Sequence, residues 1–280
     1  MNAENILDNV NLISEKLFKS VETEVYKVLD EIVVIGPEIL KSEPLKNICY
    51  TDKINGIIII ANAFILFYAI YFAIKQFINL YNGEGIGSVY KFIIRIVFTA
   101  IIVNCSYYIC EEILNLFKIL ADTVDIFCKE ISGKEATFQN LKEVILSIED
   151  FLDNDLLSLN GLIKGVISFG SVSILINFAI RYVTIVFIVL IAPFAFISLS
   201  ANITSGIFKS WCKIFIVNLL VQIIIKFIIL IPIMYKDINS IMYKIILVGA
   251  IYLIYRINNF TKEIFVKISS ESNITNFFKD

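Results

Sequence analysis

The sequence predicts an all-α, polytopic membrane protein with about five transmembrane helices and amphipathic helices outside the cytoplasm. Two observations carry this prediction. The 280 residues are 58% hydrophobic and have a mean hydropathy of +0.81, which is too apolar for an ordinary soluble domain. The apolar residues also gather in runs long enough to cross a bilayer, and long charged segments stand before and between these runs.

Residues 1–55 are predicted to be an amphipathic, extracytoplasmic region. Apolar side chains recur every three or four residues over residues 3–35, which places them on one face of a helix: Ile6, Val10, Ile13, Leu17, Val21, Val25, Val28 and Ile32. Gly36-Pro37 ends this helix, since glycine suits the position after the last turn and proline cannot continue it. A second short helix is expected near residues 37–45.

Residues 56–110 are predicted to form the first transmembrane hairpin, with spans at 56–74 and 92–110. The G-E-G-I-G run that begins at Gly83 is expected to be a flexible turn. It follows a membrane helix rather than a strand, so it lacks the context of a dinucleotide-binding loop.

Residues 111–164 are predicted to be an acidic, extracytoplasmic helical loop. Two amphipathic stripes occupy it, and Ser132-Gly133-Lys134 separates them. The first stripe contains Ile113, Phe117, Leu120, Val124, Phe127 and Ile131, and the second contains Leu141, Val144, Ile148, Phe151 and Leu156.

Residues 165–256 are predicted to be a C-terminal transmembrane bundle, and residues 257–280 a cytoplasmic tail. The run 165–201 contains a single charge, Arg181, and no turn signal beside it. One long helix kinked near Pro193 is therefore preferred to two spans, although six spans in total is the alternative. Two further spans are expected at about 213–234 and 238–255.

Charge counting predicts the orientation. Residues 1–55 contain six lysines and ten acidic residues, and residues 111–164 contain five and eleven. The loop 202–213 has two lysines and no acid, and the tail 256–280 has four basic and three acidic residues. Because cytoplasmic loops carry the excess of Lys and Arg, five spans place the N-terminus outside and the C-terminus in the cytoplasm of a multi-pass cell-membrane (inner-membrane) protein.

The residue types argue against an enzyme and against a resident metal or cofactor. Histidine is absent, the five cysteines show no C-x-x-C spacing, and neither a nucleophile–base pair nor a phosphate-binding loop is found. Cys49 and Cys128 share a compartment in the five-span topology, so they are either paired or separate thiols.

Polar side chains within the apolar spans are the candidate functional residues. Arg181 is the single charge in its span, while Asn218, Gln222 and Lys226 follow one another at one-turn spacing. Such residues either line a translocation path or join helices to one another. No acidic residue lies within a span core, which disfavours proton- or sodium-coupled transport.

The stretch 187–215 supplies a family resemblance. Its Ala192-Pro193-Phe194 motif lies between apolar runs, and Thr204, Ile207-Phe208 and Trp211 follow it. This pattern resembles the TrbL family, the polytopic inner-membrane channel components of type IV secretion and conjugation machines. The resemblance implies that Pro193 and Trp211 of this sequence are structural or translocation residues of the kind found in the family.

The resemblance implies a non-enzymatic subunit that helps to form the route for DNA or protein. Its implied partners are a secretion ATPase, other scaffold subunits, further copies of the chain and, transiently, the transferred substrate. A small-molecule transporter or permease subunit is the alternative, and a membrane-lesion protein is disfavoured. Trp211 is expected at the membrane–water boundary, where indole rings prefer to lie.

Overall fold

The computed structural model describes residue 16 and residues 24–41, 56–82, 89–146, 159–200, 205–235, 237 and 239–271. The described residues form helices joined by turns, with no strand among them. The prediction of an all-α membrane protein is thereby confirmed. The predicted N-terminal helix before residue 24 and the glycine-rich turn at 83–88 lie outside the described residues, apart from Lys16.

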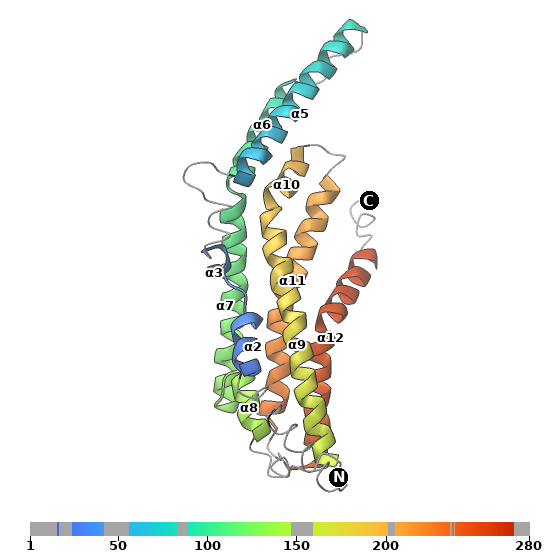
Figure 1. The fold of residues 1–280 in the computed structure, drawn as a ribbon. Helices are drawn as coiled ribbons and strands as arrows, with labels where there is room; N and C mark the ends of the chain where they lie inside the picture. The colour runs from blue at the N-terminus through green and yellow to red at the C-terminus, as the bar shows by residue number, and fades with distance from the viewer. Residues whose placement is uncertain are drawn as a thin grey trace, which may run out of the picture. The chain divides into compact units, whose positions relative to one another are not determined.

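Figure 1 shows the helices in chain order. They are α2 (Tyr26–Val33), α3 (Glu38–Lys41), α5 (Gly56–Tyr81), α6 (Val89–Asn104), α7 (Ser106–Ser132), α8 (Phe138–Leu146), α9 (Leu159–Leu190), α10 (Ala192–Ile197), the 3-10 turn η3 (Ser198–Ser200), α11 (Ser205–Ile233) and α12 (Ile241–Glu271).

Four of these helices, α5, α9, α11 and α12, are long and apolar enough to cross a membrane. The pair α6 and α7 meets the same criteria as one broken span, bent by 56° around Cys105, which makes up to five spans in the described chain. The predicted boundary of the second span at Cys110 differs from the break at Cys105, because α7 begins at Ser106 and continues into the acidic segment.

The long apolar run at 165–201 folds as one helix followed by a break. Helix α9 passes through Arg181-Tyr182 without interruption and ends at Leu190. Pro193 lies in the first turn of α10, where its missing N–H costs no helical hydrogen bond. The preferred single helix is confirmed, and the expected kink takes the form of a helix end at Ile191.

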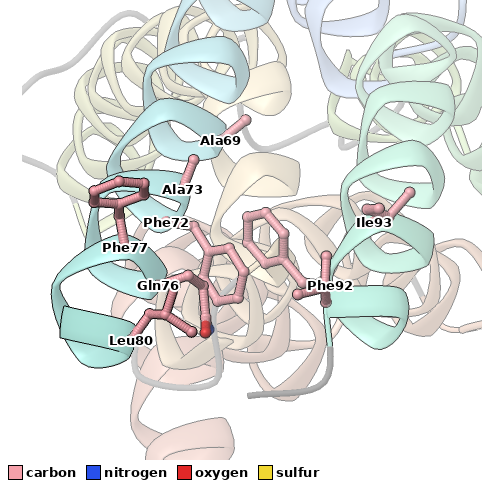
Figure 2. A pocket seen from close by; sticks show the side chains of 9 residues that line it. Ala69, Phe72, Ala73, Gln76, Phe77, Leu80, Phe92 and Ile93 are labelled. Carbon is pink, nitrogen blue, oxygen red and sulfur yellow. The ribbon is translucent and has the colours of Figure 1, made fainter. Parts of the chain in front are cut away.

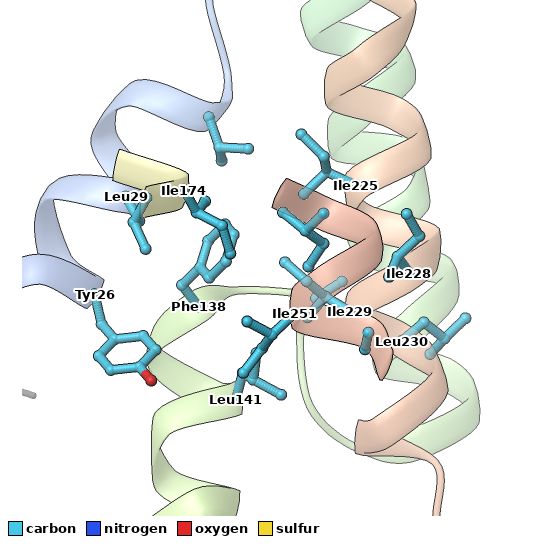
Figure 3. Packing of buried hydrophobic residues seen from close by; sticks show 14 of the residues in the cluster. Tyr26, Leu29, Phe138, Leu141, Ile174, Ile225, Ile228, Ile229, Leu230 and Ile251 are labelled. Atoms are coloured by element: carbon cyan, nitrogen blue, oxygen red, sulfur yellow. The ribbon is translucent and has the colours of Figure 1, made fainter. Parts of the chain in front are cut away.

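The chain divides into two compact units. The first contains α2, α8 and α12 with residues 117–132 of α7, 159–182 of α9 and 217–233 of α11. Its core consists of aliphatic and aromatic side chains from all six helices, and Figure 3 shows part of it, including Tyr26, Phe138, Ile174, Ile225 and Ile251. This packing holds the N-terminal segment against helices from the middle and end of the chain.

The second unit contains α3, α5, α6, α10 and η3 with the remaining parts of α7, α9 and α11. Helices α5 and α6 pack side by side, and α10 contacts both. Figure 2 shows the stacked rings of Phe72 and Phe92, whose centroids are 3.4 Å apart, in a shallow apolar groove of this hairpin. Asn62 and Asn104 exchange side-chain hydrogen bonds of 3.1 and 3.3 Å between the two helices.

The predicted helix faces are partly wrong. On α2 the buried side chains are Tyr26, Leu29 and Val33, one position beyond the predicted Val25, Val28 and Ile32, which are half-buried. On α7, Phe117 and Val124 are buried as predicted, but the predicted Leu120, Phe127 and Ile131 are exposed. These helices carry apolar side chains on more than one face, so periodicity alone does not determine which face packs on protein. The break that separates α7 from α8 is confirmed at Gly133, whose φ is 75°.

Candidate functional site: a buried polar cluster

Arg181 lies at the centre of a polar cluster inside the first unit. Its side chain is 2% exposed and donates three hydrogen bonds. Nε donates to the carbonyl oxygen of Asn218 at 2.9 Å, one terminal nitrogen donates to the carbonyl oxygen of Val33 at 3.0 Å, and the other donates to Oε1 of Gln222 at 3.3 Å. These three acceptors are neutral oxygens, so the guanidinium links α9, α11 and α2 without a carboxylate among them.

Gln222 completes this cluster from α11. Its side chain is fully buried, and its Oε1 also accepts the backbone N–H of Ile35 at 3.0 Å. Between the two backbone contacts, Val34 is extended, with φ −98° and ψ 111°. Arg181 and Gln222 therefore bind the main chain of residues 33–35 where it leaves helix α2.

Lys226 lies one turn beyond Gln222 on α11 and forms an ion pair with Asp125 of α7. The Lys226 side chain is 5% exposed and that of Asp125 19%. Burying an ammonium group is costly unless an opposite charge accompanies it, so this pair fixes α7 against α11. Along α11, Arg181 of α9 thus contacts the carbonyl oxygen of Asn218 and the side chain of Gln222, and Asp125 of α7 contacts the side chain of Lys226.

Asp30 of α2 caps the N-terminus of helix α8. Its two carboxylate oxygens accept the backbone N–H groups of Phe138 at 2.7 Å and Gln139 at 3.0 Å, which would otherwise lack helical partners. Burial raises the pKa of Asp30 above its ordinary value, although these two hydrogen bonds and the nearby Lys226 ammonium act to lower it. This carboxylate joins α2 to α8.

The hydroxyl groups of Ser171 and Tyr26 lie 3.1 Å apart and give α2 a further polar contact, in this case with α9. Ser171 also donates to the carbonyl oxygen of Ile167 in its own helix, so its hydroxyl makes one contact within α9 and one with α2. Together with the contacts of Arg181, Gln222 and Asp30, this bond holds α2 at both of its ends.

Pro193 and Trp211 lie in the second unit, in a separate cluster. The indole N–H of Trp211 donates to the carbonyl oxygen of Ile188 at 2.9 Å. The ring contacts Phe196, Phe208 and Phe215 at centroid distances of 5.5, 6.0 and 5.3 Å. Trp211 is 5% exposed, so its ring packs on protein side chains, and its expected place at the membrane–water boundary stays a prediction.

The structure brings Arg181 together with the carbonyl oxygen of Asn218 and the side chain of Gln222, and it adds partners that the sequence did not identify. Asp30, Asp125 and the backbone of residues 33–35 are the main ones. Asp125 had a detectable signal, because it lies one helical turn from the small apolar residues Ala121 and Cys128 and so shares their helix face. The contact of Gln222 with Ile35 joins residues 187 positions apart and has no local signal.

The remaining site predictions concern thiols and metals. Cys128 is a free thiol and is fully buried, while Cys49 lies outside the described residues. Within the described ranges, no group of three or more Cys, Asp or Glu side chains is arranged to hold a metal ion. Comparison with protein families, with curated proteins and with solved structures finds no match to this chain.

Proposed function

We propose that this chain is a non-enzymatic integral-membrane subunit of a type IV secretion or conjugation machine, where it helps to form the route for DNA or protein. The proposal rests on the resemblance of residues 187–215 to the TrbL family. A secretion ATPase, scaffold subunits and further copies of the chain are its proposed partners.

One observation carries the proposal furthest: the described residues of the motif lie in one compact unit, and Trp211 stacks on Phe208 of the motif. Pro193 starts a short helix directly after α9, and Phe194 packs edge-on against Phe64 of α5 with centroids 5.9 Å apart. The Trp211 indole bonds back to Ile188 near the end of α9. The Trp211 contact thus joins α11 to the end of α9.

A mating or secretion assay in a clean deletion strain tests this function. We expect substrate transfer to be lost, and expression of the intact gene to restore it. Site-specific crosslinking from the 205–213 segment is expected to capture the secretion ATPase. Normal transfer in the deletion strain would refute the proposal.

The proposed orientation, with the N-terminus outside and the C-terminus in the cytoplasm, has its own test. Cys128 is a poor reporter because it is fully buried. Exposed positions are better, so we would place single cysteines at Lys129 and Lys209 in a background without native thiols. An impermeant thiol reagent is expected to label position 129 and not position 209 in intact cells, and the opposite result would invert the topology.

A second candidate function, a small-molecule transporter or permease subunit, is favoured by one contact. The predicted spans contain no acidic residue in their cores, but Asp125 of α7 forms an ion pair with Lys226 of α11. Substitution of Asp125 by Asn would then abolish uptake of a substrate while leaving macromolecular transfer intact. The secretion proposal expects no such separation of the two activities.

A further inference from the structure

Three basic side chains gather where α5 ends and α6 begins. Lys75 lies in the last two turns of α5, and Lys91 and Arg95 lie one helical turn apart near the start of α6. All three are exposed, and neither helix contains an acidic residue. This end of the hairpin therefore carries a concentrated positive charge.

The stacked rings of Phe72 and Phe92 show how the three cations are arranged (Figure 2). Lys75 follows Phe72 by three residues, and Arg95 follows Phe92 by the same number. In an antiparallel pair of helices that meet at these rings, equal offsets fall on the same side of the contact. Lys91 shares the face of Arg95, and at about 1.5 Å per residue the three positions span only about 9 Å along the hairpin.

The other side of the same contact is apolar. A groove of about 410 Å³ lies there, and its lining includes Ala69 and Ala73 of α5 and Val89 and Ile93 of α6. Gln76 is the single polar residue of the lining, and none of the three cations takes part in it. Acyl chains of any lipid fit this groove, so a preference for charge is confined to the side of the hairpin that carries the cations.

Exposed apolar side chains stand among the cations. Tyr71 and Ile78 lie within one turn of Lys75, Phe98 lies within one turn of Arg95, and these three are 53–61% exposed. An acidic, water-soluble partner would neutralise the charge but leave this apolar surface uncovered. A zwitterionic lipid would cover the surface but leave the charge without a counter-ion. A phospholipid with a net negative charge does both.

We infer that Lys75, Lys91 and Arg95 form a binding site for the headgroup of an anionic phospholipid, whose acyl chains cover the apolar side chains around them. Lysine and arginine near the end of a membrane helix extend their charged groups to the headgroup level, which brings them to the lipid phosphate. This site goes beyond the proposed function, because it specifies a lipid ligand whichever machine contains the subunit.

Spin-labelled lipids test the inference in the full chain. The purified protein is reconstituted into phosphatidylcholine vesicles that contain a trace of spin-labelled phosphatidylglycerol or of spin-labelled phosphatidylcholine. The motionally restricted part of each electron spin resonance spectrum gives the relative affinity of the protein for the two lipids. We expect a preference for phosphatidylglycerol that falls as sodium chloride is raised from about 0.05 M to about 0.5 M, because salt screens exposed charges.

A triple variant locates this preference on the hairpin. Lys75→Gln, Lys91→Gln and Arg95→Gln together are expected to bring the affinity for phosphatidylglycerol to within about twofold of that for phosphatidylcholine. The charge-conserving combination of Lys75→Arg, Lys91→Arg and Arg95→Lys is expected to keep the preference of the unchanged protein.

A matched control removes the same charge elsewhere. Lys129, Lys134 and Lys142 lie between α7 and the middle of α8, and the first two form ion pairs with Glu135 and Glu143. Changing all three lysines to Gln is expected to leave the lipid preference unaltered.

Glycerol 3-phosphate separates a lipid from a free phosphate as the ligand. It offers the headgroup chemistry without acyl chains. At equal ionic strength it is expected to lower the lipid preference no more than sodium chloride does, and stronger competition would overturn the lipid as the ligand.

Two results with the unchanged protein would overturn the inference without reference to the folding of any variant. These are the absence of a preference for phosphatidylglycerol and a preference that salt does not reduce. Among the variants, an undiminished preference in the triple Gln variant of the hairpin would overturn it. An equal loss in the charge-conserving variant or in the distant control would do so too, because recognition would then not depend on these three charges.

Discussion

Helices α5 and α11 have similar composition, yet the chain covers them very differently. Of the 26 residues of α5, only Ala61 and Ile65 are buried. The α11 helix buries most of one continuous stretch, which includes Leu219, Gln222, Ile225 and Ile229. The two helices differ in their buried polar side chains rather than in their hydropathy: α11 carries Gln222 and Lys226, and both side chains have partners in the first unit.

The largest expected effect on stability comes from removing the buried charge of Lys226 on α11. Lys226→Met leaves the Asp125 carboxylate partly buried without its counter-ion, which costs about 3–5 kcal/mol. We expect a large fall in the unfolding midpoint in a detergent titration. The matched control Lys75→Met, at an exposed position of α5, is expected to leave it nearly unchanged, and equal effects at the two positions would contradict the comparison.

A second test concerns the close packing of the first unit. A Cβ atom added at Gly170 of α9 would lie 2.6 Å from Cγ2 of Ile251 on α12, a buried and branched side chain. We expect Gly170→Ala to lower the free energy of unfolding by about 1–3 kcal/mol.

Gly165→Ala is the matched control on the same helix. Nothing lies within 4 Å of the added atom at that position, and alanine favours a helix over glycine by about 1 kcal/mol. A stability equal to or above that of the unchanged protein is therefore expected. Equal destabilisation by both substitutions would mean that α9 and α12 do not pack closely at Gly170.

A third test follows from the titration of Asp30. Because its pKa is raised in the folded protein, the folded state binds a proton more readily than the unfolded chain does. The contribution of this group to stability is therefore present below its ordinary pKa and lost as the pH rises through the raised value. Unfolding midpoints of the unchanged protein and of Asp30→Asn, measured between about pH 3.5 and about pH 6, should show this loss only in the former. Parallel pH profiles would contradict the assignment.

The smallest effect is expected in the second unit. Asn104→Leu removes the hydrogen bonds with Asn62 that join α6 to α5. Contacts of this kind between membrane helices contribute about 0.6 kcal/mol on average. A midpoint shift well below that of Lys226→Met is expected. A larger shift would show that the hairpin depends on its polar contact as strongly as the first unit does.

Sequence patterns predicted the helices well and the contacts between them poorly. The uninterrupted passage of α9 through Arg181 and the turn at Gly133 have local causes and were predicted, while the kink predicted near Pro193 is found as a helix end at Ile191. The partners of Gln222 depend on where α2 returns in space, which no local pattern specifies. The aromatic partners of Trp211 were not predicted either, because a residue suited to a lipid interface is equally suited to an aromatic cluster within the protein.

The ion pair of Lys226 with Asp125 has a consequence for biosynthesis. A ribosome completes Asp125 about one hundred residues before it adds Lys226, and synthesis proceeds at about 5–20 residues per second. The Asp125 carboxylate is therefore synthesised several seconds before the Lys226 ammonium group with which it pairs. The ion pair that joins α7 to α11 can form only after the chain has been made as far as residue 226.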